Sequence, residues 1–244
     1  MSKNKSASLE ARIKNSKDLV VTVKNLTLYN PSSEDIKPAN YEEFVNAVDA
    51  GITGYKSAAA ELNAANDTLK QSFEKMEKVS RNVRSEIVEL KGKSSAEYNR
   101  VNILIKVILG ENVTEHSRMK NTVIKNLKEG DPQPQFSSVS ALDYKSRLGN
   151  FRSLIGTIKT FGFYEPTDSS ISVTSLESLE AETAGNLEKT ALRVIKFAGE
   201  RSRIMHYFDS GHGLKDRAAR AKRHIRRKYG AASPEYKVTS NKKY

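Results

Sequence analysis

The chain has 244 residues, of which 37% are hydrophobic and 29% are charged, and its net charge is +12. It contains no cysteine, which excludes disulfide bonds, thiolate metal ligands and a cysteine nucleophile. The longest apolar run, residues 101–109, is too short to cross a bilayer, and the N-terminal segment lacks an apolar signal core, so we expect a cytoplasmic protein.

Sparse glycine and proline favour long helices over turn-rich β-structure. The first helix is predicted over residues 8–28, with Ile13 and Val23 near one face. Pro31 ends it, because proline lacks a backbone donor and keeps its predecessor out of the helical region. Tyr29 is interpreted as a packing anchor at this helix end.

A second helix is predicted to begin near Asn40, where Glu43 completes a capping box three residues later. Apolar residues then recur at steps of three, four or seven from Phe44 to Leu90. This spacing indicates one helical stripe of about fifty residues. Gly92 is the predicted end of the helix.

Residues 99–141 form the connection between the two halves of the chain. Residues 101–109 are rich in β-branched side chains, which leaves helix and strand both open. Residues 115–128 are predicted to be helical, because their apolar side chains are spaced by four. Residues 130–135 (GDPQPQ) form the clearest linker and mark a predicted domain boundary.

Residues 148–171 repeat the sequence of residues 13–36 at an offset of 135 positions. Seven of the 24 positions are identical, and most of the others exchange similar side chains. The identical pairs are Asn15/Asn150, Leu19/Leu154, Thr22/Thr157, Lys24/Lys159, Tyr29/Tyr164, Pro31/Pro166 and Ile36/Ile171.

In the second copy, the long helix is predicted to begin near Thr174, with Glu177 as its capping partner. Residues 209–213 (DSGHG) interrupt it, and a new helix follows over residues 214–229. Beyond this break the offset between the copies is 138. The second copy therefore holds three extra residues at the glycine loop, whereas the first copy is predicted to continue as one helix.

These elements predict an all-α fold of two homologous long-helix bundle units in tandem. The first repeat unit spans residues 8–98, and the second spans residues 142–236. Residues 99–141 connect them, with the linker at 130–141, and residues 237–244 form a basic tail. The long apolar stripes predict an elongated, pseudo-symmetric body and are compatible with homo-oligomers.

Short motifs in the second copy carry a resemblance to known proteins: residues 201–203 (RSR), Gly213 with Leu214, and residues 229–237 (YGAASPEYK). With these motifs the chain resembles an uncharacterised family of all-helical bacterial proteins. The resemblance implies a duplicated organisation, a Tyr-x-Pro-type loop before a long helix and a basic tail. The first copy departs from this pattern, because it lacks the glycine break. No activity is assigned to that family, so no functional residue is carried over.

Positive charge is concentrated near the C-terminal end. Residues 215–243 hold eleven Lys and Arg against two acidic residues, which favours an acidic partner. Cations spaced by three and four along a helix can follow a phosphate backbone, and few Asn or Gln are present to read bases. The candidate nucleic-acid-binding residues are Lys215, Arg217, Arg220, Lys222, Arg223, Arg226, Arg227 and Lys228.

Other interpretations of this basic helix stay open. A basic amphipathic helix can bind membrane lipid or an acidic protein. A run of charge is also common on a solvated helix face without a specific partner. Tyr229 is the one aromatic residue next to the cations, so stacking on single-stranded bases is not indicated.

No catalytic or metal-binding motif is present in the sequence. The one enzymatic alternative is a site formed by His206, Asp209 and His212 at the glycine loop. The competing interpretation is that His212 is an ordinary loop histidine between two glycines, without a catalytic role. The sequence therefore predicts a non-enzymatic structural or interaction protein without a cofactor. The alternative is nucleic-acid binding without sequence specificity through residues 214–229.

Overall fold

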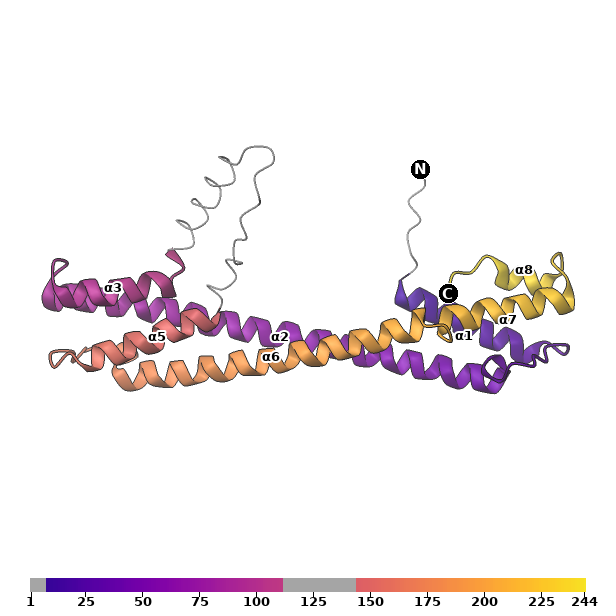
Figure 1. The fold of residues 1–244 in the computed structure, drawn as a ribbon, viewed down its shortest axis with the longest axis horizontal. Helices are drawn as coiled ribbons and strands as arrows, with labels where there is room; N and C mark the ends of the chain where they lie inside the picture. The colour runs from indigo at the N-terminus through magenta and orange to yellow at the C-terminus, as the bar shows by residue number, and fades with distance from the viewer. Residues whose placement is uncertain (1–7, 112–143) are drawn as a thin grey trace, which may run out of the picture. The chain divides into compact units, whose positions relative to one another are not determined.

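The structure is a computed structural model that describes residues 8–111 and 144–244 (Figure 1). Every regular element within these ranges is a helix, so the predicted all-α fold is confirmed. The elements are α1 (Leu9–Asn25), η1 (Glu34–Ile36), α2 (Pro38–Lys91), α3 (Ala96–Ile108), α5 (Tyr144–Lys159), η3 (Ser169–Ile171), α6 (Val173–Asp209), α7 (Leu214–Tyr229) and α8 (Pro234–Ser240).

The chain divides into two compact units. Unit 1 consists of the described residues of Met1–Leu62 and Arg193–Tyr244, and unit 2 is formed by those of Asn63–Leu192. The long helices α2 and α6 each contribute residues to both units. The units therefore combine portions of both predicted repeats, 8–98 and 142–236, and these repeat ranges stay a prediction about the sequence.

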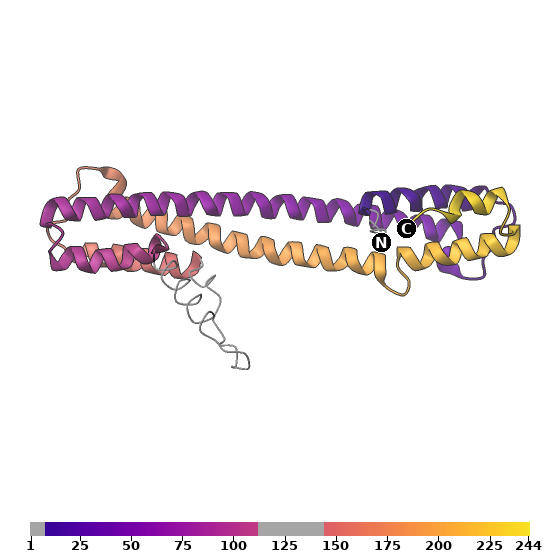
Figure 2. The same cartoon turned by 90° about the horizontal axis from the view of Figure 1, so that it is seen from above.

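The core of unit 1 is formed by α1, α7, the first part of α2 and the last part of α6. Leu19 and Val23 of α1 are buried one turn apart, as an amphipathic helix requires. Ala218, Ala221 and Ile225 of α7 are buried in the same core. α7 packs against α1, η1 and α8, and Figure 2 shows α7 beside α8.

Unit 2 has a separate apolar core, to which α3, α5, the second part of α2 and the first part of α6 contribute. Its largest fully buried side chains include Phe73, Ile105 and Phe151. α3 packs against α5 (Figure 1). The two cores share no residue, so each unit is stabilised by its own apolar burial.

Serine and glycine define matching helix ends in the two units. Ser95 caps α3 and Ser233 caps α8, each through an Oγ that accepts a backbone N–H at 3.1 Å. Gly92 and Gly230 precede these caps with φ angles of 80° and 95°. Residues that have a Cβ atom rarely adopt such positive φ angles, whereas glycine does so readily. The predicted end of the long helix at Gly92 is confirmed, because α2 ends one residue earlier.

The interruption predicted in the second copy is also confirmed. α6 ends at Asp209 and α7 begins at Leu214, whereas α2 is unbroken from Pro38 to Lys91. Gly213 lies in the turn between α6 and α7, where a Cβ atom would approach a backbone oxygen of α6 to 2.8 Å. Glycine is therefore required there by a close backbone approach.

Both predicted capping boxes are wrong. α2 begins at Pro38, two residues before Asn40, because the fixed φ of proline suits the first helical turn. The Asn40 side chain instead donates a hydrogen bond to the carbonyl oxygen of Glu34 at 2.9 Å. Ser172 rather than Thr174 caps α6, and its Oγ accepts a backbone N–H at 3.3 Å.

For residues 101–109 the sequence left helix and strand both open. These residues fall almost entirely within the helix α3. The helix predicted over 115–128 and the linker at 130–135 lie outside the described residues. α8 extends to Ser240, so the first part of the predicted tail 237–244 is helical.

Candidate nucleic-acid interface

The eight predicted cations all lie on α7, whose buried apolar stripe fixes the orientation of the helix in unit 1. Three of them, Arg217, Arg220 and Lys222, are half-buried and form contacts within the unit. The other five are exposed: Lys215, Arg223, Arg226, Arg227 and Lys228.

Arg220 is the centre of an ion-pair network. Its Nη1 donates to Asp35 Oδ1 and to Ser33 Oγ, both at 3.0 Å, and its Nε donates to Asp216 at 2.8 Å. The hydrogen bond from Arg220 holds the pKa of the Asp35 carboxyl well below its usual range. Arg220 therefore connects α7 to the loop around η1, and its charge is compensated.

Arg217 and Lys222 also bind within unit 1. Arg217 Nη1 donates to the Asp35 carbonyl oxygen at 2.8 Å, and its guanidinium carbon lies 3.9 Å from the centre of the Phe44 ring. Lys222 Nζ donates to two carbonyl oxygens at and just after the end of α8, at 2.8 and 3.3 Å. Burial lowers the pKa of Lys222. These two cations fasten the η1 loop and the C-terminal segment to α7.

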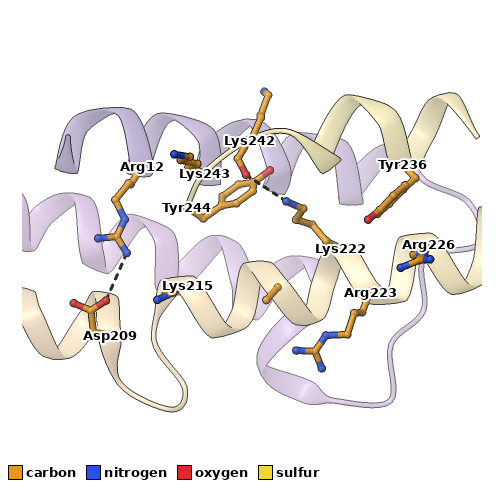
Figure 3. Close-up of a pocket in the computed structure, with 11 residues that line it drawn as sticks. Arg12, Asp209, Lys215, Lys222, Arg223, Arg226, Tyr236, Lys242, Lys243 and Tyr244 are labelled. Carbon is orange, nitrogen blue, oxygen red and sulfur yellow. Dashed lines mark hydrogen bonds and ion pairs between the residues drawn. The ribbon is translucent and has the colours of Figure 1, made fainter. Parts of the chain in front are cut away.

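A cavity of about 580 Å³ in unit 1 gathers basic side chains from α1, α7 and the C-terminal segment (Figure 3). Asp209 supplies the single acidic side chain of its lining. Positive charge gathered in a concave site produces a stronger local potential than the same charge on a convex surface. The basic side chains that line it are Arg12, Lys215, Lys222, Arg223, Arg226, Lys242 and Lys243.

Few of these cavity charges are neutralised. Arg12 points toward Asp209, with 3.7 Å between the charged groups (Figure 3), and Lys242 pairs with Asp18 at 2.6 Å. Lys222 is held by carbonyl oxygens, which carry no net charge. The cavity cations whose charged groups bind no partner among the described residues are Lys215, Arg223, Arg226 and Lys243.

Sequence reasoning missed the cavity residues outside α7. Arg12 comes from α1, far from α7 in the sequence, and Lys243 follows α8. Tyr236 and Tyr244 add two aromatic rings to the lining, one of which lies beside Lys222 at 5.1 Å. The charge count over residues 215–243 includes Lys243 but did not place it beside α7, and no sequence pattern links Arg12 to the basic helix, because tertiary packing brings both residues there.

The residues of the enzymatic alternative do not form one site. His206 and His212 are exposed, and the ring of His212 lies 3.5 Å from the Asp35 carboxylate. Asp209 pairs with Arg12 instead. The proximity of these residues in the sequence therefore does not become a shared pocket in the structure.

Two other features, a metal centre and a membrane-spanning helix, are absent from the part of the chain that the structure describes. No group of three or more His, Asp or Glu side chains in it could hold a metal ion. None of its helices combines the length and apolar character needed to cross a membrane. Comparison of the chain with known protein families, curated proteins and solved structures finds no match. The resemblance to duplicated all-helical proteins therefore stays a prediction.

Proposed function

We propose that the chain is a non-enzymatic interaction protein that binds the phosphate backbone of nucleic acid through the cavity and the exposed cations of α7. The observation that carries this proposal is the gathering of seven basic side chains around one cavity with a single acidic side chain. Like charges repel one another, so cations that were only solvated would be more stable if spread apart. A polyanion relieves this repulsion and releases its own counterions.

The chemistry of the lining favours phosphate contacts over base recognition. Lys and Arg supply the charged donors, and neither Asn nor Gln lines the cavity. Such contacts position a nucleic acid without reading its sequence. Duplexes of unrelated sequence are therefore expected to bind with similar affinity.

We also infer that the rest of the molecule is a scaffold made from two copies of one helical framework. Equivalent local structures support this inference. The Tyr29 hydroxyl donates to the Ile36 carbonyl oxygen at 2.9 Å, and the Tyr164 hydroxyl donates to the Ile171 carbonyl oxygen at 2.8 Å. Under this proposal the two copies have a pseudo-symmetric relation, and the second copy adds the basic helix.

Fluorescence anisotropy with a labelled duplex, measured over a series of salt concentrations, tests nucleic-acid binding. The variant combines Lys215→Gln, Arg223→Gln and Arg226→Gln, and it leaves Arg220 unchanged because Arg220 stabilises unit 1. We expect at least a tenfold loss of affinity. The slope of log K against log salt should decrease by roughly 0.9 for each phosphate contact that is lost.

A matched variant of unit 2 controls for net charge. Lys93→Gln, Arg100→Gln and Lys106→Gln remove the same charge from exposed positions that belong to unit 2. This variant should retain most of the affinity. Equal losses in both variants, or no binding to duplex at low salt, would contradict the proposal.

A further inference from the structure

A second hollow lies on α7 beside the loop of residues 31–36 in unit 1, with a volume of about 400 Å³. The loop contributes Ser32 to its lining, and α7 contributes Arg223, His224 and Arg227. Of these, only Arg223 also lines the larger cavity. The hollow therefore presents its own set of donors.

His224 lines this hollow and has an unpaired, buried hydrogen-bond donor. The residue is 6% exposed, and burial, with Arg227 and Lys228 adding repulsion, lowers the pKa of His224, so the ring is neutral near pH 7. Arg227 Nη2 lies 3.2 Å from Nδ1, and a guanidinium can only donate. Nδ1 is therefore the acceptor, and Nε2 carries the proton. Nε2 is buried and has no hydrogen-bond partner among the described residues.

The two flanking arginines hold uncompensated positive charge. Arg223 and Arg227 are exposed, lie one turn apart on α7, and form no ion pair with the described residues. The nearby Asp35 carboxylate is neutralised by Arg220, which also fixes the loop through Ser33. The loop that borders the hollow is thus held in place by Arg220, and Arg227 is held by its contact with His224 Nδ1.

The corresponding place in unit 2 has the opposite charge. Tyr29 lies edge-on to His224, with 5.0 Å between ring centres. In unit 2, Tyr164 lies near Glu86, whose charge adds to burial in raising the pKa of that tyrosine. Glu86 matches His224 at the offset of 138, and a second glutamate matches Arg227. The anion-binding donors are therefore particular to unit 1.

We propose that this hollow binds a phosphate group, with the exposed Arg223 and Arg227 on its oxygens and the His224 ring in the wall beside them. The His224 Nε2–H is covered, so it donates to the phosphate only after the side chains that cover it move aside. The proposal goes beyond backbone binding at the larger cavity, because it assigns a discrete oxyanion site. Free phosphate and the phosphodiester of a nucleic acid share the required chemistry: oxygen acceptors with negative charge.

Titration of the full chain with inorganic phosphate at constant ionic strength, followed by ¹H–¹⁵N NMR of the imidazole rings, tests the site. We expect a saturable shift of the His224 Nε2 signal, with a Kd on the order of 1 mM. Arg227→Glu should weaken binding at least tenfold. Arg226→Glu makes the same charge change on the side of α7 that lines the larger cavity and should leave the Kd within about twofold.

Arg223→Glu is a second variant in case Arg227→Glu alters the fold, which circular dichroism would detect. Dimethyl phosphate, used in parallel, distinguishes the sources: tighter binding than inorganic phosphate assigns the site to a phosphodiester, and weaker binding assigns it to free phosphate or a monoester. Either result supports a phosphate site. No saturable shift at His224, or equal weakening by Arg226→Glu and Arg227→Glu, would overturn it. If the parent chain bound no duplex at low salt but still gave the saturable His224 shift, the backbone-binding proposal would be refuted and the phosphate site would stand.

Discussion

The Tyr29 and Tyr164 hydroxyls each bind a carbonyl oxygen seven positions later in the chain and so close a loop. Their side chains are 6% and 8% exposed, and each hydroxyl donates to a buried carbonyl oxygen at the end of a 3₁₀ turn. Burial raises the pKa of both tyrosines, so the hydroxyls stay protonated and continue to donate. Each loop thereby has one fixed shape before its long helix.

We predict that Tyr29→Phe and Tyr164→Phe each reduce the free energy of unfolding by about 1–2 kcal/mol, because a buried carbonyl loses its donor. Urea denaturation followed by circular dichroism measures the loss. Tyr55→Phe is the control, because the Tyr55 hydroxyl forms no hydrogen bond with the described residues. A loss at Tyr55 equal to those at the loop tyrosines would contradict this explanation.

Asp35 gives unit 1 a pH dependence. The Arg220 hydrogen bond lowers the folded-state pKa of Asp35 below that of the unfolded chain, so the carboxylate stabilises the fold above about pH 4. That contribution is lost as the pH falls through the lowered value. Asp35→Asn should therefore cost about 2 kcal/mol at neutral pH and progressively less in acid.

Urea unfolding at a series of pH values tests this dependence. Asp67→Asn serves as the comparison, because Asp67 is exposed and has no ion pair among the described residues. Its stability should follow that of the parent chain at every pH. A cost for Asp35→Asn that stayed constant into acid would show that the charge of Asp35 is not the cause.

At the scale of the elements, the turn between α6 and α7 depends on one glycine. A Cβ atom at Gly213 would lie 2.8 Å from the Tyr207 carbonyl oxygen and 3.0 Å from the backbone of Phe208. These atoms belong to the end of α6, so they cannot rotate away as a flexible side chain would. The turn that separates α7 from α6 therefore requires a residue without a Cβ atom at position 213.

We predict that Gly213→Ala destabilises the chain by about 1–3 kcal/mol, because the backbone must shift to relieve the clash. Gly211→Ala in the same turn has no atom within 4 Å of its new Cβ and should be neutral or slightly stabilising. Thermal unfolding of the two variants makes the comparison. Equal losses of stability in the two variants would mean that the flexibility of the turn, rather than the close contact at Gly213, determines the effect.

The sequence predicted the long elements better than their ends. Sustained spacing of apolar residues located α2 and α6, because burial of one face dominates the energy of a long helix. The sequence did not distinguish helix from strand in α3, because its β-branched residues favour a strand locally. Val101, Ile105 and Ile108 nevertheless lie on one helical face and are fully buried, so packing in unit 2 overrides local propensity.

At the scale of the whole molecule, two apolar cores lie in one chain. The core of unit 1 contains Phe208, and that of unit 2 contains Phe151; both side chains are at most 1% exposed. No residue belongs to both cores. Local opening of one unit therefore need not expose the core of the other.

We predict that Phe208→Ala and Phe151→Ala each cost about 3–5 kcal/mol, because each leaves a cavity that packing only partly fills. Native-state hydrogen exchange should show that each variant reduces amide protection mainly in its own unit. Uniform loss of protection over the whole chain in both variants would instead mean that the two units open as one.

For the candidate site, the sequence predicted which cations lie on one helix but not which of them are neutralised by a partner. Periodicity placed all eight cations on α7, and the structure separates three compensated cations from five exposed ones. The separation depends on Asp35 and on carbonyl oxygens near the end of α8, which no local pattern connects with α7. Arg12 reaches the cavity only because α1 packs against α7.

The division of the chain into units has a consequence for synthesis on the ribosome. Unit 2 is continuous in sequence, so all of its residues have emerged before the last part of unit 1 is translated. Unit 1 must wait for Arg193–Tyr244, and closing its core joins residues separated by the whole of unit 2. The entropic cost of closing so long a loop is smaller if unit 2 is already compact. We therefore expect the nascent protein to fold from its middle outward, with the basic helix among the last elements to dock.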